Sequence, residues 1–431
     1  MEDRYNAIVS RITMENNHEG VLSGWDVAIK DNFNLKGTYT TASSKLLQNY
    51  QSLYTASSVD KLILQGANLV CKTSMDELGL GGTGRNAYTG PTKNPHDLER
   101  ISGGSSSGSA ALVAGKLVRM ALGSDTGDSV RKPASYCGVV GMKPSYGRIS
   151  RYGLIAYASS LDHVGYFTHN VKDSAETLNV LAGRDDLDLQ SSFEPVPNYT
   201  QYDASLEGKR IGIFSSVHSV MDQSIVGDAI EDLKKTLSAK GAIIVEKTMP
   251  LEILRTVLPV YNVISNVEAL ANHASLDGVR FGEQGEGATL EEIMTQTRTQ
   301  GIGSKARIRY TFGAFASEGE NHEAIFEKTK KVRRVIANAY SALFDDIDAL
   351  CVMASGTIAA RIDDVEVYSN EDSHTIGENH LALQNMSGHP SITIPWALYE
   401  GMPLGLNITG KLFQEQTLFG IAAGLEKGEV R

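Results

Sequence analysis

Two glycine-rich turns of this chain contain serines, a residue type that can act as a nucleophile or carry a proton. Residues 103–109 read Gly-Gly-Ser-Ser-Ser-Gly-Ser, and residues 126–129 read Thr-Gly-Asp-Ser. Glycines let the backbone approach a ligand closely and direct several amide groups at one point. A serine hydroxyl in such a turn can attack a carbonyl carbon or relay a proton, provided that a base accepts that proton. Lys30, within the segment Ala-Ile-Lys-Asp-Asn, is the candidate base, so the pattern predicts a hydrolytic centre.

Further motifs accompany these segments in a fixed order. Along the chain the order is Lys30-Asp31, residues 103–109, residues 123–131, Pro133 and Cys137-Gly138. With this set of motifs, the chain resembles the amidase signature family, whose hydrolases use a Ser–Ser–Lys triad. The resemblance extends from about Gly24 to Glu426.

The resemblance implies a role for each residue of the triad. Ser129 would be the nucleophile, Lys30 the base, and Ser105, after a cis peptide bond with Gly104, the bridging serine. Lys30 can accept a proton only when neutral, and burial favours the neutral form by lowering the pKa of a lysine. A hydroxyl both donates and accepts, so Ser105 can pass a proton between the other two. The implied oxyanion hole consists of the backbone amides of Thr126, Gly127, Asp128 and Ser129.

The second turn departs from the family pattern at two positions. Asp128 and Lys132 stand where the family usually has glycine and glutamine. The backbone amide of Asp128 is unchanged, so the oxyanion hole can survive the substitution. A carboxylate would repel a developing oxyanion unless it points away or pairs with Arg131 or Lys132. We expect such pairing.

The resemblance also implies residues that recognise the substrate. Arg309 would bind a free α-carboxylate, because a guanidinium matches a carboxylate bidentately. Glu378 would face an α-ammonium group, and Tyr261 would line the same pocket. An acid and a base in one pocket suit a zwitterionic amino acid, whereas a simple fatty amide would need neither.

One group within the family matches further segments of the chain. Residues 75–77, 141–165 and 170–173 are similar to those of the amidase subunits of glutamyl-tRNA(Gln) amidotransferases. This similarity implies a glutaminase that supplies ammonia to an activating partner, the B subunit of the amidotransferase, where ATP and Mg²⁺ are expected. A small third subunit is also expected, with no cofactor or metal in this chain. The net charge of −11 is a poor footprint for nucleic acid, so Glu-tRNA(Gln) should be bound mainly by the partner.

Two other functions are compatible with the motifs. A stand-alone amidase of small amides would place Arg309 and Glu378 outside the pocket. A catalytically weak structural subunit is suggested by Asp128 within the oxyanion turn. A dinucleotide-binding loop at residues 79–84 is rejected because it follows a helix-like segment. A hydrolase nucleophile elbow at residues 104–108 is rejected because Asp162-His163 would have to complete its triad.

Composition and patterning favour one large α/β domain. The 431 residues are 41% hydrophobic and contain three scattered cysteines, which indicates a reducing compartment. The short lead at residues 1–23 and the altered motifs favour a fungal mitochondrial form, whereas a bacterial form would be cytoplasmic. No run of 18 apolar residues is present, so no membrane span is predicted.

Alternating strands and helices predict a mixed central sheet covered by helices on both faces, the fold of the amidase signature family. We expect a single domain over residues 1–431, with a surface excursion at residues 184–203. Strands are expected at residues 25–30, 67–71, 119–122, 210–214, 242–245, 349–353, 391–394 and 404–409. Helices are expected at residues 58–65, 109–114, 225–240 and 323–344, and a further helix is expected to start over residues 73–78.

Overall fold

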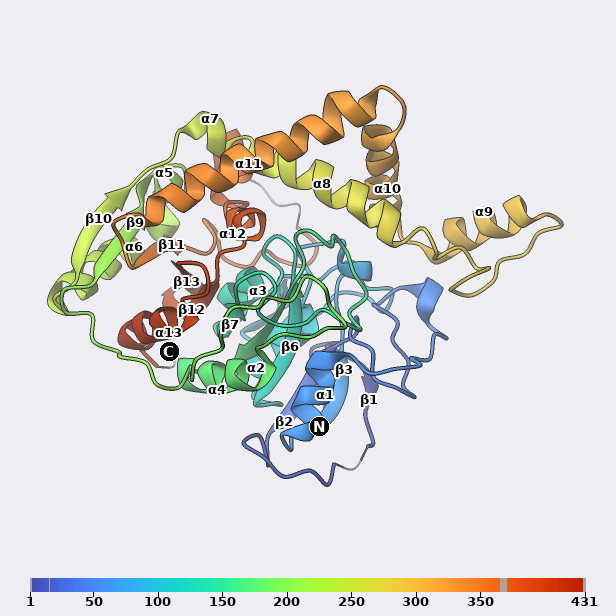
Figure 1. Ribbon diagram of the computed structural model, residues 1–431, viewed down its shortest axis with the longest axis horizontal. Coiled ribbons are helices and arrows are strands. Elements are labelled where there is room, and N and C mark those ends of the chain that lie inside the picture. Colours follow the sequence, from blue (N-terminus) through green and yellow to red (C-terminus); the bar gives the residue numbers. More distant parts are fainter. Residues whose placement is uncertain (1, 15, 365–369, 429–431) are drawn as a thin grey trace.

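The computed structural model describes residues 2–14, 16–364 and 370–428 (Figure 1). Its centre is an 11-stranded sheet with the order β1-β3-β2-β6-β8-β7-β12-β13-β11-β9-β10. The strands are β1 Ile8–Arg11, β2 Asp26–Lys30, β3 Asn68–Thr73, β6 Met120–Asp125, β7 Val140–Lys143, β8 His163–Thr168, β9 Arg210–Phe214, β10 Ile243–Lys247, β11 Ala349–Met353, β12 Ser391–Tyr399 and β13 Met402–Gly410. Strand β2 is parallel to β3 and β6, and β9 is parallel to β10 and β11. The other pairings in the sheet are antiparallel, so the predicted mixed sheet is confirmed.

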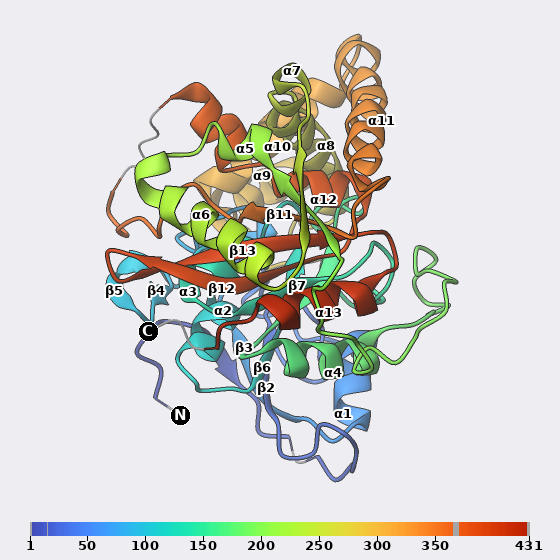
Figure 2. The same cartoon turned by 90° about the vertical axis from the view of Figure 1, so that its left-hand side faces the viewer.

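Helices cover both faces of the sheet, as predicted (Figure 2). They are α1 Ser57–Leu64, α2 Ser107–Ala114, α3 Arg131–Cys137, α4 Val171–Leu181, α5 Ser215–His218, α6 Gln223–Ala239, α7 Leu251–Leu254, α8 Val257–Asn272, α9 Leu290–Gly301, α10 Ser304–Ser317, α11 Lys328–Ser341, α12 Ala382–Ser387 and α13 Glu415–Leu425. A small hairpin of β4 Lys93–Asn94 and β5 Asp97–Ile101 lies outside the main sheet. None of the helices among the described residues is long and apolar enough to cross a membrane.

The two faces of the sheet are built by side chains that alternate along each strand. On β2, Val27 and Ile29 belong to the large core that also contains Leu178 of α4. Ala28, between them, belongs to a second core with residues 110–113 of α2. Small side chains on that second face let α2 lie close to β2, which brings the serine-rich turn before α2 toward Lys30.

Helix ends follow local sequence signals. The side chain of Asp222 accepts the amide of Ser224 and begins α6, and Thr289 with Glu292 forms a capping box at α9. Gly138 ends α3 with a φ of 65°, in the left-handed region where glycine is favoured. Of these three helices only α6 was expected, and its bounds, Gln223–Ala239, lie within two residues of the expected 225–240.

One expected helix is wrong. Residues 73–78 do not form a helix, because β3 continues to Thr73 and only a 3₁₀ turn follows at Glu77–Gly79. The buried carboxylate of Asp76 accepts the backbone amides of Gly84 and Asn86 and thereby organises a loop. The expected helix at residues 323–344 is present as a π-helical turn at His322–Glu327, α11, and a 3₁₀ turn at Ala342–Phe344.

Helix α8 packs against both α10 and α11 beside the sheet, and α9 projects from this group (Figure 1). Sequence patterning missed α8, α9 and α10, yet α8 carries Tyr261 and α10 carries Arg309. Residues 184–203, the expected surface excursion, contain no helix or strand, and Leu189 and Phe193 are exposed there.

Candidate active site

Lys30 ends β2, and its side chain is completely buried among serines. Its Nζ lies 2.8 Å from Ser105 Oγ, 2.9 Å from Ser106 Oγ and 2.9 Å from Ser124 Oγ. The carbonyl oxygen of Ser124 lies 3.3 Å from the same nitrogen. The predicted contact between Lys30 and Ser105 is therefore present, and two further serines complete the surroundings of the amine.

Burial lowers the pKa of Lys30 from its ordinary value of 10.5 to about 7. The carboxylates of Asp76, Asp125 and Asp162 act in the opposite direction, because negative charges favour the ammonium form. Desolvation is the larger effect, so about half of the Lys30 amines are neutral at pH 7. A neutral amine beside the Ser105 hydroxyl can accept its proton, which is the property that the proposed base needs.

Ser105 and Ser129 lie on adjoining backbone segments. The peptide bond between Gly104 and Ser105 is cis, as the resemblance implied. The amide of Ser106, the next residue, donates to the carbonyl oxygen of Ser129 at 3.2 Å. Ser105 is 2% exposed and Ser129 is 5% exposed. The structure thus brings the three residues of the predicted triad to one buried place, while their catalytic roles stay a prediction.

The turn between β6 and α3 leaves its amides available. Within the part of the chain that the structure describes, no group accepts a hydrogen bond from the backbone amides of residues 126–129. The hydroxyl of Thr126 donates to Asp162 Oδ1 at 2.6 Å, and the amide of Val130 donates to Asp125 Oδ2 at 2.8 Å. A Cβ atom on Gly127 would lie 2.9 Å from the ring of Tyr261, so only glycine fits without displacement. The arrangement suits an oxyanion hole.

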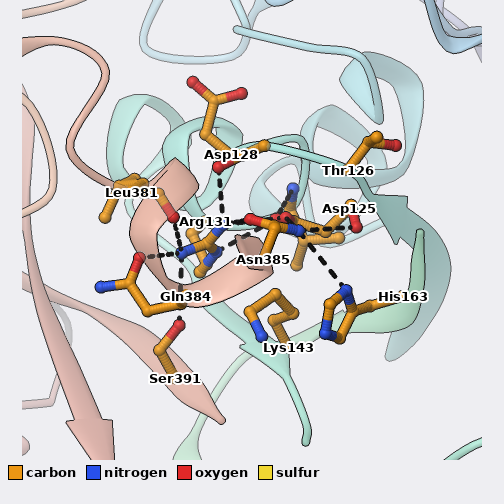
Figure 3. Close-up of polar contacts among 12 residues, drawn as sticks. Asp125, Thr126, Asp128, Arg131, Lys143, His163, Leu381, Gln384, Asn385 and Ser391 are labelled. Carbon is orange, nitrogen blue, oxygen red and sulfur yellow. Dashed lines mark hydrogen bonds and ion pairs between the residues drawn. The ribbon is translucent and has the colours of Figure 1, made fainter. Parts of the chain in front are cut away.

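Arg131, the first residue of α3, holds this turn through a cluster of buried polar contacts (Figure 3). Its fully buried guanidinium contacts both carboxylate oxygens of Asp125, at 2.8 and 3.1 Å, and donates to the carbonyl oxygen of Gly127 at 2.8 Å. Its other acceptors are Leu381 O, Gln384 Oε1 and Asn385 Oδ1, in or beside α12, and Ser391 Oγ at the start of β12. Although burial acts to raise the pKa of Asp125, the pairing with Arg131 keeps it well below its usual range. Arg131 therefore fixes the turn to α12.

Asp128 was expected to pair with Arg131 or with Lys132, and the structure shows the pair with Lys132. Lys132 Nζ lies 3.5 Å from Asp128 Oδ2, one helical turn away. Figure 3 shows the carboxylate of Asp128 pointing away from the buried cluster around Arg131. Burial raises the pKa of Asp128, and Lys132 offsets part of that effect. The ion pair with Lys132 thus offsets part of the negative charge that Asp128 places beside the turn.

A cavity of about 590 Å³ adjoins the turn and contains all three predicted recognition residues. Tyr261 from α8, Arg309 from α10 and Glu378 line it together with Gly127 and Asp128. Lys30, Ser105 and Ser129 are not among the lining residues, and the turn at residues 127–128 joins them to the cavity. The glycine-rich loop that sequence analysis rejected as a dinucleotide site contributes to the wall through residues 81–83.

Hydrogen bonds from neutral groups help to hold Arg309 and Glu378 in place, and Lys132 Nζ also lies 3.3 Å from Glu378 Oε2. Arg309 Nη1 donates to the hydroxyl of Tyr157 at 2.6 Å. Glu378 Oε1 accepts the amide of Gly356 at 2.8 Å, and Glu378 Oε2 accepts the hydroxyl of Ser355 at 2.8 Å. A base and an acid therefore share one cavity, as expected for the recognition of a zwitterion.

Sequence reasoning missed four residues that complete the site. Ser106 and Ser124 contact Lys30, Tyr157 holds Arg309, and Asp162 holds Thr126. Ser106 and Ser124 lie inside the two serine-bearing motifs. Their hydroxyl groups, in motifs expected to surround Lys30, were the signal in the sequence that could have identified them. Burial raises the pKa of Asp162 to about 6. This residue also accepts the amide of Tyr157 at 2.8 Å, which links the oxyanion turn to the partner of Arg309.

The fold and the cluster of serines around a buried lysine are those expected of an amidohydrolase, and the chain belongs to the Amidase family. The sequence profile of that family, described as Amidase, matches residues 3–419.

Within the Amidase family, the chain is similar to several proteins with named activities. The chain is 40% identical, over 94% of its length and 84% of the relative, to the A subunit of the glutamyl-tRNA(Gln) amidotransferase of Lactobacillus delbrueckii subsp. bulgaricus. The crystal structure of the corresponding A subunit from Thermotoga maritima is similar with a TM-score of 0.82 and 31% identity, over 99% of this chain and 90% of that one. The peptide amidase of Stenotrophomonas maltophilia is similar with a TM-score of 0.81 and 28% identity, over 96% and 84% of the two chains.

Proposed function

We propose that this chain is the glutamine-hydrolysing subunit of an amidotransferase that converts Glu-tRNA(Gln) to Gln-tRNA(Gln). The observation that carries the proposal is the buried Lys30 amine, hydrogen-bonded to Ser105 beside the Ser129 turn, at the edge of a cavity with a base and an acid. Relatives named as the A subunit of this amidotransferase match almost the whole chain, which supports the same substrate.

The proposed reaction begins with Ser129. Its Oγ attacks the side-chain amide carbon of glutamine while its proton passes through the Ser105 hydroxyl to the neutral amine of Lys30. The amides of residues 126–129 bind the oxyanion of the tetrahedral intermediate, and losing one such donor typically costs about 10²–10³ in rate. Lys30 returns the proton through Ser105 to the leaving nitrogen, and ammonia departs. Water then attacks the glutamyl ester by the same proton path and releases glutamate.

The cavity supports glutamine as the substrate. Arg309 is a permanent cation and suits the α-carboxylate, whereas Asp128 and Glu378 supply negative charge for the α-ammonium. The location of Arg309 and Glu378 inside the cavity argues against a stand-alone amidase of simple amides. The pairing of Asp128 with Lys132 argues against a weak structural subunit, because the ammonium group offsets part of the negative charge of the carboxylate beside the turn.

Partners complete the proposed activity. Ammonia would pass to the B subunit, which would activate Glu-tRNA(Gln) with ATP and Mg²⁺, and a small third subunit would join the complex. The negative net charge of this chain, −11, favours tRNA contacts made mainly by the partner. A mitochondrial location stays a prediction from the altered motifs, and the relatives named above are bacterial, for which a cytoplasmic location would apply.

The test uses the complex that co-purifies with this chain. Glutamine-dependent formation of Gln-tRNA(Gln) from Glu-tRNA(Gln) is measured for the wild type and for Ser129→Ala. We expect conversion by the wild type, none by the variant with glutamine, and restored conversion by the variant with ammonium chloride. Conversion would be absent, and simple amides would be hydrolysed faster than glutamine, if the chain were a stand-alone amidase.

A further inference from the structure

Asp162 lies between the turn that would form the oxyanion hole and the residue that holds Arg309. It is 3% exposed and directly precedes β8. Its Oδ1 atom accepts the hydroxyl of Thr126 at 2.6 Å. Its Oδ2 atom accepts the backbone amides of Tyr157 and Ala158, at 2.8 and 3.0 Å. One buried carboxylate therefore joins two segments that are distant in the sequence.

The hydrogen bonds of Asp162 stabilise a charge that burial disfavours. Burial raises the pKa of this carboxyl group to about 6, while the hydrogen bonds from Thr126, Ala158 and Tyr157 and the charge of Arg151 act in the opposite direction. A buried carboxylate that loses its donors is unfavourable, so the carboxylate and its donors keep one another in place. The position of Thr126 is thus fixed relative to residues 157 and 158.

Tyr157 extends this constraint to Arg309. Its backbone amide is bound to Asp162, and its hydroxyl accepts a hydrogen bond from Arg309 Nη1 at 2.6 Å. Its carbonyl oxygen accepts Asn272 Nδ2 at 3.1 Å, and the residue is buried. A tyrosine side chain turns about only two bonds, so a tyrosine bound at both its backbone and its hydroxyl is a stiff spacer. Arg309 is therefore held at a set distance from the turn.

Tyr261 provides a second contact between the same parts of the site. Its hydroxyl interacts with that of Tyr157, and its ring would lie 2.9 Å from a Cβ atom on Gly127. At the turn this contact is one of packing only, whereas Asp162 is fixed to both segments by hydrogen bonds. The two contacts can be separated by experiment, because each depends on a different side chain.

The two parts that Asp162 joins would bind opposite ends of the proposed substrate. The turn at residues 126–129 would receive the amide oxygen, and Arg309 the α-carboxylate. Four bonds separate the amide carbon of glutamine from its carboxylate carbon, a span of roughly 5 Å when extended, and asparagine is shorter by one bond, or about 1.3 Å. A misplacement of about 1 Å can cost roughly 10²-fold in rate. A fixed distance between the turn and Arg309 therefore discriminates between amides by their length.

We propose that Asp162 is a positioning residue that sets the length of the amino-acid amide that the site accepts. By holding Thr126 and Tyr157 together, it fixes the distance between the oxyanion turn and Arg309. This assignment rests on the proposed hydrolysis of glutamine and names the residue that selects the length of that substrate. Asp162 acts through its two neighbours and not by contact with the reacting atoms.

Kinetics with two amides that differ by one methylene group test this role. kcat and KM for glutamine and asparagine are measured on the complex that co-purifies with this chain, at pH 8, where Asp162 is ionised. We expect the wild type to prefer glutamine in kcat/KM by about 10- to 100-fold. Asp162→Ala should reduce this preference to less than about threefold, mainly by lowering kcat/KM for glutamine, because the distance is no longer fixed.

A milder variant keeps the test decisive if Asp162→Ala does not fold. Thr126→Val preserves the shape of the side chain and removes only the hydroxyl that Asp162 accepts. We expect it to reduce the preference for glutamine by at least about threefold, as for the loss of one hydrogen bond. An unchanged preference in Thr126→Val overturns the inference, whatever the state of Asp162→Ala.

Two matched controls separate length selection from other effects. Glu415, in α13, is fully buried, accepts the amide of Ser145 at 3.0 Å and is not among the residues that line the cavity. Glu415→Gln therefore removes a buried charge away from the site, and we expect it to leave the preference within about twofold of the wild type. Tyr261→Phe removes the hydroxyl that meets Tyr157 and leaves Asp162 unaltered, so its effect on the preference should be smaller than that of Asp162→Ala.

The remaining outcomes distinguish this inference from the proposed function. Equal losses on both amides in Asp162→Ala, a wild type without preference for glutamine, or an equal change of preference in Glu415→Gln or Tyr261→Phe overturns the role of Asp162. None of these results affects the hydrolysis of glutamine itself. A wild type that hydrolyses 4-aminobutanamide, which lacks the carboxylate, as well as glutamine contradicts the proposed function instead.

Discussion

Lys30 should control how glutamine hydrolysis depends on pH. At its ordinary pKa of 10.5, about one lysine in 3,000 would be neutral at pH 7. With the pKa lowered to about 7, that fraction is about one half, a gain of roughly 10³ in available base. The neutral fraction then rises from about 10% at pH 6 to about 90% at pH 8. We therefore expect kcat/KM to rise about ninefold over this interval and to level off above it.

The assay follows ammonia release from glutamine between pH 5.5 and 9, roughly 1.5 to 2 pH units on each side of the inflection. Lys30→Arg is the matched variant, because a guanidinium keeps its charge throughout this range and cannot act as the base. We expect it to lose about 10²–10⁴ in kcat/KM, the usual contribution of a general base. Its residual activity should lack the inflection near pH 7.

The Lys30→Arg variant is needed as a control because a buried carboxyl group, that of Asp162, could also titrate in this pH range. Burial raises the pKa of Asp162 to about 6, so its deprotonation would also increase activity with pH, but one unit lower. An inflection that persists in Lys30→Arg would assign the pH dependence to Asp162 or another group. A wild-type profile that stays flat from pH 6 to 8 would refute the role of Lys30 as a base of lowered pKa.

The other predictions concern the turn and the cavity. Arg131→Ala should lower the free energy of unfolding in urea by about 3–5 kcal/mol, because it leaves Asp125 buried without its cation; a loss below about 1 kcal/mol would contradict the anchoring role. Arg309→Ala should weaken the binding of glutamine by about 10- to 150-fold and raise its KM accordingly, while affecting 4-aminobutanamide, an amide that lacks the carboxylate, far less. Equal increases in the two KM values would remove Arg309 from carboxylate recognition. Asp128→Gly should lower kcat for glutamine, because it removes the pairing with Lys132 and adds backbone freedom; a higher kcat would indicate that the carboxylate crowds the oxyanion.

The triad could be located from the sequence because each member lies in a compact motif. Lys30 ends a strand, and the two serine turns each precede a helix, so local patterns identify all three. Their convergence follows from the parallel pairing of β2 with β6 and from the small side chains that let α2 approach. Hydrophobic patterning alone predicts neither the strand pairing nor the approach of α2. The expectation that the three residues meet came from the family resemblance.

The residues that the sequence did not reveal depend on contacts between distant segments. Tyr157 meets Arg309 across 152 positions of the chain, and no local pattern marks either residue as one of a pair. The expected helix at residues 73–78 failed because one buried carboxylate, Asp76, organises the backbone of a loop. Helix α10 was missed because two of its large apolar residues, Ile308 and Phe312, are exposed, so the apolar positions do not mark one buried face.

The most direct test of the central claim is to trap the acyl-enzyme. The complex is mixed with glutamine and quenched in acid, and its peptides are analysed by mass spectrometry. We expect a glutamyl ester on the peptide that contains Ser129, sensitive to hydroxylamine and absent from Ser129→Ala. A glutamyl group on a different residue, or full glutamine hydrolysis by Ser129→Ala, would contradict the account.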